Sequence, residues 1–167
     1  MKEKRIVIYT DGAARGNPGP AGWGAVILFK DDKLKVESGK LKVVEIGGRV
    51  PHATNNQMEL RAPIEALKYL KMSRFDLDIV EVEIVADSKY VVLGITEWIN
   101  NWIEKNWRGA KKKKVLNREL WEELYKLNEE FKPKWSYVEG HNGDKYNDRA
   151  DLIATSFADN EPVKLRK

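Results

Sequence analysis

The spacing of apolar and polar residues at the start of the chain predicts a set of successive strands. An apolar and β-branched run over residues 6–10, followed by Gly12, indicates a strand buried on both faces. Residues 23–30 predict a second strand. The alternation of apolar and polar residues over residues 33–42 predicts a third strand with one solvent-exposed face. Three strands in this order predict an antiparallel meander. Residues 43–53 stay unassigned, because their paired glycines favour a hairpin tip or a bulge.

Helical spacing dominates the rest of the chain. It predicts helices over residues 54–72, 88–94, 96–106, 117–131 and 144–158, with a fourth strand over residues 79–86 and a fifth over residues 135–138. The first of these helices crosses over between the third and fourth strands. A crossover of this kind predicts that the fourth strand pairs parallel with the first.

Length and composition narrow the class of protein. The chain has 167 residues and no cysteine, which excludes a disulfide framework, a thiolate zinc site and a cysteine nucleophile. No apolar run approaches the length needed to cross a bilayer, and no apolar signal region opens the chain. We therefore expect a cytoplasmic protein without membrane association, with one domain over residues 1–160 and a frayed tail over residues 161–167.

The positive charge is concentrated in one segment. Residues 98–118 carry seven basic side chains against the single acid Glu104, a charge of +6, which leaves −2 for the other 23 basic and 25 acidic residues. The basic residues are Lys105, Arg108, Lys111, Lys112, Lys113, Lys114 and Arg118. Such a segment attracts a polyanion independently of sequence. Trp98, Trp102 and Trp107 lie among these charges, where they either stack on bases or pack helices, and we expect at least one in the core.

Two aspartates follow strands that are predicted to be parallel neighbours. Asp11 comes after the first strand and Asp87 after the fourth. Neighbouring strands lie about 4.8 Å apart, close to the ~3.5–4 Å between the ions of a two-metal site. A divalent cation would relieve the repulsion between these carboxylates. The alternative is that Asp11 and Gly12 are ordinary turn residues.

Three further residues are candidates with equally simple alternatives. Glu59 lies in the first turn of the crossover helix, where it either joins the carboxylates or forms a capping box with Asn56. Asp151 shares a helix face with Asn147, although an exposed helical aspartate is usually only solvated. His141 lies in a glycine-containing loop and has the usual alternative of a surface histidine.

Four segments in one order, TDGAARGNPGPAGWG, TNNQMEL, ADSKYV and EGHNGDKYNDRAD, closely resemble those of the type 1 ribonucleases H. The resemblance covers residues 5–158 and implies an α/β fold with a five-stranded mixed sheet, three strands antiparallel and two parallel, flanked by helices. It implies an endonuclease that cleaves the RNA strand of RNA–DNA hybrids. It also implies that Asp11, Glu59, Asp87 and Asp151 bind metal and that His141 is catalytic.

Oxygen-only ligands of this kind suit Mg²⁺ or Mn²⁺. Two ions bound with the substrate would support in-line hydrolysis that leaves 5′-phosphate and 3′-hydroxyl ends. His141 would assist proton movement or product departure, because histidine titrates near neutrality.

The resemblance also implies which residues meet the substrate. Ala14, Gly16, Asn17, Glu59 and Lys89 match positions that face the RNA strand, while Asn17, Asn55 and Asn56 offer amides to sugars and base edges. Thr54 matches a contact to a phosphate of the DNA strand. Lys111, Lys112, Lys113 and Lys114, with Trp98 and Trp102, match the basic protrusion of some members. Lys89 replaces a common glutamine and His52 lies near a common phosphate-binding arginine, but no catalytic residue is missing.

Two other functions remain open on the sequence. One is a hybrid-binding module without catalysis, against which the complete set of carboxylates argues. The other is a related polynucleotidyl transferase that acts on DNA, such as an integrase or transposase core, which usually lacks the glycine-rich loop and the basic segment. For the ribonuclease H interpretation we expect a monomer with no obligate protein partner.

Overall fold

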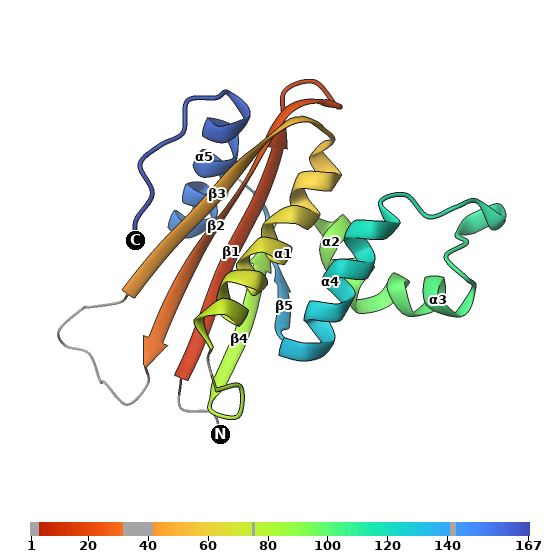
Figure 1. Cartoon of the computed structure of the whole chain (residues 1–167), viewed down its shortest axis with the longest axis horizontal. Coiled ribbons are helices and arrows are strands. Elements are labelled where there is room, and N and C mark those ends of the chain that lie inside the picture. The colour runs from red at the N-terminus through yellow and green to blue at the C-terminus, as the bar shows by residue number, and fades with distance from the viewer. Residues whose placement is uncertain (1–3, 32–41, 75, 141–142) are drawn as a thin grey trace.

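A five-stranded mixed sheet lies at the centre of the structure, in the order β3-β2-β1-β4-β5 (Figure 1). The structure is a computed structural model that describes residues 4–31, 42–74, 76–140 and 143–167. The strands are β1 (Lys4–Ala14), β2 (Gly19–Asp31), β3 (Lys42–Ala53), β4 (Val80–Ala86) and β5 (Lys134–Tyr137). β1, β2 and β3 pair antiparallel, whereas β4 pairs parallel with both β1 and β5. The predicted fold class is confirmed.

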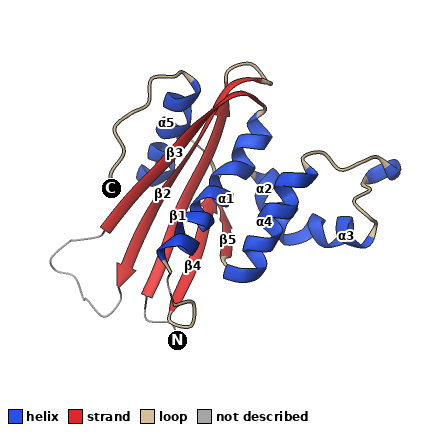
Figure 2. Ribbon diagram, in the orientation of Figure 1, coloured by secondary structure: helices blue, strands red, loops and turns tan. Residues whose placement is uncertain are grey.

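Helices cover both faces of this sheet. They are α1 (Asn55–Ser73), α2 (Lys89–Leu93), the π-helical turn η1 (Gly94–Trp98), α3 (Ile99–Glu104), the short 3₁₀ turn η2 (Ala110–Lys112), α4 (Arg118–Phe131) and α5 (Lys145–Ala158). α1 and α4 lie on one side of the strands and α5 on the other (Figure 2). Among the described residues, no helix is both long and apolar enough to cross a bilayer.

β1 is buried on both faces, as its apolar run predicts. Ile6 and Ile8 belong to the core between the sheet and α1, while Val7 belongs to the core beneath α5. Side chains alternate between faces along a strand, so a central strand with a helix on each side needs apolar residues at every position. β1 is therefore a rigid base for the residues that follow it.

The third strand differs from the sequence prediction. The predicted strand over residues 33–42 lies outside the described residues except for Lys42, where β3 begins. Gly47 and Gly48 lie within β3 and form no hairpin tip. A Cβ atom at Gly47 would lie 2.5 Å from the ring of Phe157, and one at Gly48 would lie 2.7 Å from Nε1 of Trp23. These glycines thus provide space for aromatic side chains within a regular strand.

The C-terminal residues also differ from the prediction, because residues 161–167 are held against the domain. The Glu45 amide donates a 2.8 Å hydrogen bond to the Arg166 carbonyl, and the Arg166 amide donates to Oε1 of Glu45 at 2.9 Å. Arg149 of α5 donates to both Glu45 oxygens, at 2.7 and 3.0 Å, and to the Lys164 carbonyl at 2.9 Å. The tail therefore follows the outer edge of β3 instead of fraying.

Candidate active site

The end of the parallel ladder between β1 and β4 brings two aspartates to one edge of the sheet. The ladder ends where Thr10 lies opposite Ala86, so Asp11 and Asp87 are the next residues on the two strands. Asp11 itself remains inside β1, because the antiparallel pairing with β2 continues to Ala14. The expected juxtaposition is confirmed, although Asp11 lies within the strand and not in a turn.

Gly12 brings the crossover helix to this edge. A Cβ atom on Gly12 would lie 2.3 Å from the carbonyl carbon of Met58 and 2.4 Å from the nitrogen of Glu59. The backbone of α1 thus occupies the space that a side chain would need. The close approach places Glu59 beside Asp11, whose Oδ1 accepts a 2.8 Å hydrogen bond from the Gly12 amide.

Glu59 has no part in capping α1, contrary to the alternative that the sequence left open. The capping box is formed by Thr54 and Gln57. The Gln57 amide donates to Oγ1 of Thr54 at 3.1 Å, and the Thr54 amide donates to Oε1 of Gln57 at 2.9 Å. Glu59 is two residues further along the helix, so its carboxylate is directed to the acidic cluster instead.

Asp11, Glu59 and Asp87 form a tight acidic cluster. Each offers a carboxylate oxygen, and these oxygens all lie within 4.8 Å of one another. Asp11 is only 4% exposed, and Oε2 of Glu59 is buried without a hydrogen-bond partner in the described structure. Burial, together with the neighbouring carboxylates, raises the pKa of Asp11 and of Glu59, that of Glu59 to about 8. These carboxyl groups therefore resist ionisation together, and a divalent cation would stabilise their ionised form.

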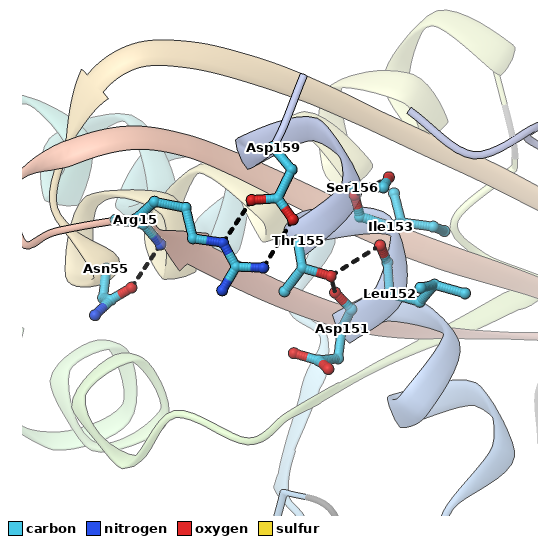
Figure 3. Close-up of polar contacts among 9 residues, drawn as sticks. Arg15, Asn55, Asp151, Leu152, Ile153, Thr155, Ser156 and Asp159 are labelled. Carbon is cyan, nitrogen blue, oxygen red and sulfur yellow. Dashed lines mark hydrogen bonds and ion pairs between the residues drawn. The ribbon is translucent and has the colours of Figure 1, made fainter. Parts of the chain in front are cut away.

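Asp151 joins the cluster from the opposite layer. α5 begins at the N-cap Asp144, which accepts hydrogen bonds from the amides of Tyr146 and Asn147. Asp151 lies farther along α5, and its carboxylate projects from the helix (Figure 3). Its side chain contributes to the raised pKa of Asp11. Asp11, Glu59 and Asp87 thus converge from the sheet edge and α1, whereas Asp151 of α5 interacts with Asp11 and lies outside the group within 4.8 Å.

His141 lies outside the described residues, so its predicted role stays a prediction. The residue before it, Gly140, lies against the acidic cluster. A Cβ atom on Gly140 would be 3.0 Å from Oδ2 of Asp87. The chain leading to position 141 therefore passes directly beside one of the candidate metal ligands.

The glycine-rich loop between β1 and β2 is tied to the start of α1. The Ala14 amide donates to Oδ1 of Asn55 at 2.7 Å, and the Asn55 amide donates to Oδ1 of Asn17 at 2.9 Å. Gly16 has φ +78°, a backbone conformation that favours glycine. Both asparagine oxygens thus bind within the protein. The side-chain amide nitrogens have no partner among the described residues and remain available to a ligand.

The other predicted substrate residues lie at the starts of α1 and α2. Asn56 is exposed in the first turn of α1, and Thr54 is its N-cap. Lys89 lies at the start of α2, with Nζ 5.3 Å from the centre of the Tyr137 ring. Lys89 follows Asp87 by two residues and Asn56 precedes Glu59 by three, so both are close in sequence to the acidic cluster.

The basic segment extends away from the sheet between α3 and α4 (Figure 1). Its four consecutive lysines, Lys111 to Lys114, are all exposed. Trp107 is buried and anchors the segment, with the Arg118 guanidinium 5.2 Å from its ring centre. The expectation that at least one tryptophan belongs to the core is thus confirmed. Trp98 is 38% exposed, and Trp102 is half-buried against Trp121.

Two polar arrangements near the site were not found from the sequence. Oδ1 of Asn117 accepts from Nε2 of Gln57 at 3.2 Å, and its Nδ2 donates to the Tyr90 hydroxyl at 3.1 Å, which links the starts of α1 and α4. Arg15 forms an ion pair with Asp159, 144 residues away. The only local signal for Arg15 was that it is the one charged residue between Asp11 and Lys30.

Comparison with known proteins agrees with the geometry of this site. A family model described as RNase H matches residues 3–159. The chain is 47% identical over 159 residues to a ribonuclease H of Thermosynechococcus vestitus, covering 95% of this chain and 92% of that protein. It is 44% identical over 154 residues to a ribonuclease H of Wolbachia pipientis, covering 92% and 95% respectively.

Solved structures show the same arrangement of strands and helices. LC9-RNase H1, described as a type 1 RNase H with the type 2 active-site motif, superposes with a TM-score of 0.82 at 24% identity, covering 99% of this chain and 76% of that one. At this identity the similarity establishes the fold alone. LC11-RNase H1 in complex with an RNA/DNA hybrid has a TM-score of 0.62 at 30% identity, covering 93% of this chain and 97% of that one.

Proposed function

This chain belongs to the ribonuclease H family, and on that premise we propose that it hydrolyses the RNA strand of RNA–DNA hybrids. The family consists of metal-dependent endoribonucleases, so the chain is an enzyme of this class. The observation that carries the proposal is the convergence of Asp11, Glu59 and Asp87 within 4.8 Å, with Asp151 beside them. The hybrid bound to LC11-RNase H1 supports the choice of substrate.

The four carboxylates would hold two Mg²⁺ or Mn²⁺ ions when the substrate is bound. Their donor set is oxygen only, and the unpartnered Oε2 of Glu59 together with the buried Asp11 carboxylate supplies charge that a hard cation would neutralise. The bound ions would supply activation of the attacking water and stabilisation of the departing 3′ oxygen. The products would carry 5′-phosphate and 3′-hydroxyl ends.

The protein's own contribution is to fix its ligands before the substrate arrives. Asp11 is held by its hydrogen bond from the Gly12 amide on a strand buried on both faces, and Glu59 is held by the packing of α1 against Gly12. Preorganised ligands of this kind need no rearrangement during the reaction. His141 would move a proton or assist the product to leave.

Discrimination against DNA requires contact with the 2′-hydroxyl groups of the RNA strand. The glycine-rich loop suits this task, because Ala14 and Gly16 let the backbone approach a sugar closely. Asn17, Asn55 and Asn56 would donate from their amide nitrogens to sugars and base edges, and Lys89 would face the RNA strand. Thr54 would contact a phosphate of the DNA strand. We propose that residues 1–160 form one catalytic domain that acts as a monomer.

Replacing Lys111, Lys112, Lys113 and Lys114 by alanine is expected to raise KM for the hybrid and to leave kcat unchanged. These lysines are exposed in the segment that extends away from the sheet between α3 and α4, so they would attract the phosphates without touching the reacting bond. Each phosphate contact adds about one unit to the slope of log KM against log salt concentration, so the slope should fall by several units. Steady-state kinetics between 50 and 200 mM salt measures both effects. A large loss of kcat would place the lysines in the active site instead.

The proposed activity is tested with a hybrid whose RNA strand is labelled at its 5′ end. We expect internal cuts in the RNA strand with Mg²⁺, none with EDTA, and no cutting of duplex DNA or duplex RNA. The released ends should accept a 3′-extension by a polymerase without prior phosphatase treatment. Binding without metal-dependent cutting would favour the hybrid-binding module, and comparable cutting of duplex DNA would favour the polynucleotidyl transferase.

A further inference from the structure

The charged side chain of the glycine-rich loop forms a bidentate ion pair with the end of α5. Nε and Nη2 of Arg15 donate to Oδ1 and Oδ2 of Asp159 at 2.6 and 2.8 Å (Figure 3). The planar guanidinium matches both carboxylate oxygens at once, so the contact fixes direction as well as distance. Asp159 is the C-cap residue of α5.

Arg15 also lies where the two ends of the loop meet. Its amide donates a 2.7 Å hydrogen bond to the Pro20 carbonyl, and a Cβ atom on Gly19 would lie 1.9 Å from the Arg15 carbonyl oxygen. The two arms of the loop are therefore in close contact at Arg15. A shift of this residue has to move Gly16 and Asn17 with it.

The ion pair gives the loop a second attachment, on the side opposite to α1. Asn55 holds Ala14 and Asn17 from α1, the helix of Glu59, while Asp159 holds Arg15 from α5, the helix of Asp151. Asp151, Thr155 and Asp159 are spaced four residues apart, which places them along one side of α5, and Thr155 donates to the Asp151 carbonyl at 3.0 Å. One side of α5 thus supports both the acidic cluster and the loop.

We propose that Arg15 and Asp159 form a clamp that positions the glycine-rich loop for reading the RNA strand. Both side chains are about half exposed, at 53% and 44%, and exposed ion pairs contribute little to the free energy of unfolding. The effect of the clamp is therefore on the position of the loop and not on the stability of the fold. This role rests on the proposed function, in which the loop contacts 2′-hydroxyl groups.

Two variants separate positioning from simple attraction of the polyanion. Arg15→Lys keeps the positive charge but loses the two-pronged contact, and Asp159→Asn removes a negative charge that repels the substrate. Attraction alone predicts an unchanged KM for the first and a lower KM for the second. The clamp predicts that both raise KM about three- to tenfold with kcat within twofold, and that the double variant resembles either single one.

The measurement specific to the loop is the increase in KM when 2′-hydroxyl groups are removed from the substrate. A hybrid with deoxynucleotides beside the cut site should raise KM for the unaltered chain, and this increase should shrink at least threefold in Arg15→Lys and Asp159→Asn. Glu161→Gln is the control, since Glu161 is an exposed acid two residues after Asp159 whose side chain has no partner among the described residues. Glu161→Gln should leave this increase in KM unchanged.

The outcomes separate this inference from the proposed function. If the unaltered chain cuts the hybrid but both clamp variants behave like Glu161→Gln, the clamp is overturned and the nuclease stands. If Asp159→Asn lowers KM, Arg15 acts by charge and the clamp is again overturned. If the unaltered chain cuts no hybrid, the proposed function and the clamp's role in reading RNA fail together.

Discussion

Replacement of Asp11 by asparagine is expected to lower kcat for hybrid cleavage roughly a thousandfold or more, equivalent to about 4 kcal/mol of transition-state stabilisation. The substitution keeps the size of the side chain and can keep the acceptor for the Gly12 amide. It removes one negative charge from a cluster in which Asp11, Glu59 and Asp87 are crowded within 4.8 Å. The loss of activity therefore reports the loss of a ligand and not of the fold.

In the absence of metal, the same variant is expected to be at least as stable as the unaltered chain, by up to about 2 kcal/mol. Burial and neighbouring carboxylates raise the pKa of Asp11 in the folded state. A carboxyl group with a raised folded pKa destabilises the fold at pH values above its unfolded pKa. The advantage of Asp11→Asn should therefore be present at pH 7 and disappear below about pH 4, where the carboxyl group is protonated in both states.

Urea unfolding of both proteins in EDTA, at pH 7 and pH 3.5, measures this difference. Asp78→Asn is the matched control, because Asp78 is exposed in the connection before β4, at the opposite end of that strand from Asp87. It should change neither kcat nor stability appreciably. Clear destabilisation of Asp11→Asn at pH 7, or kcat within tenfold of the unaltered chain, would contradict the account.

Gly12→Ala is expected to reduce kcat about a hundredfold and the free energy of unfolding by about 1–3 kcal/mol. The added Cβ would lie 2.3 Å from the Met58 carbonyl carbon and 2.4 Å from the Glu59 nitrogen, and backbone atoms cannot rotate out of its way. α1 would have to move off β1 and take Glu59 away from Asp11. A displacement of about an ångström is enough to cost this much rate.

The control for Gly12→Ala is Gly109→Ala, where the nearest atom to the new Cβ would be 3.8 Å away. Its kcat and unfolding free energy should match those of the unaltered chain. A Gly12→Ala variant with normal kcat would mean that the contact between β1 and α1 does not position Glu59 for the reaction.

Local patterns predicted the central parts of the fold and of the site. The apolar run that forms β1 and the alternation that forms β4 are properties of short segments, and the crossover rule then places Asp11 beside Asp87. The role of Glu59 was more difficult to predict, because two possible capping boxes, Thr54 with Gln57 and Asn56 with Glu59, overlap in the sequence. Only the structure shows that Thr54 and Gln57 form the cap and leave Glu59 to the cluster.

The features that the sequence did not predict depend on residues distant in the chain. Gly47 and Gly48 resemble a turn, yet they make room for side chains from α5 and β2. Glu45 pairs with Arg149 across 104 residues and with Arg166 across 121, so nothing near the C-terminus indicates that the tail is held. The ion pair of Arg15 and Asp159 is invisible for the same reason.

The most direct test of the central claim is the cleavage rate of a hybrid with sulfur in place of one non-bridging oxygen at a single cut site, in Mg²⁺ and in Mn²⁺. If Asp11, Glu59, Asp87 and Asp151 hold ions against that phosphate, one of the two stereoisomers should be cut much more slowly in Mg²⁺. Mn²⁺, which accepts sulfur more readily, should restore the rate. Equal rates for the oxygen and sulfur substrates with both stereoisomers in Mg²⁺ would contradict contact between the ions and the phosphate.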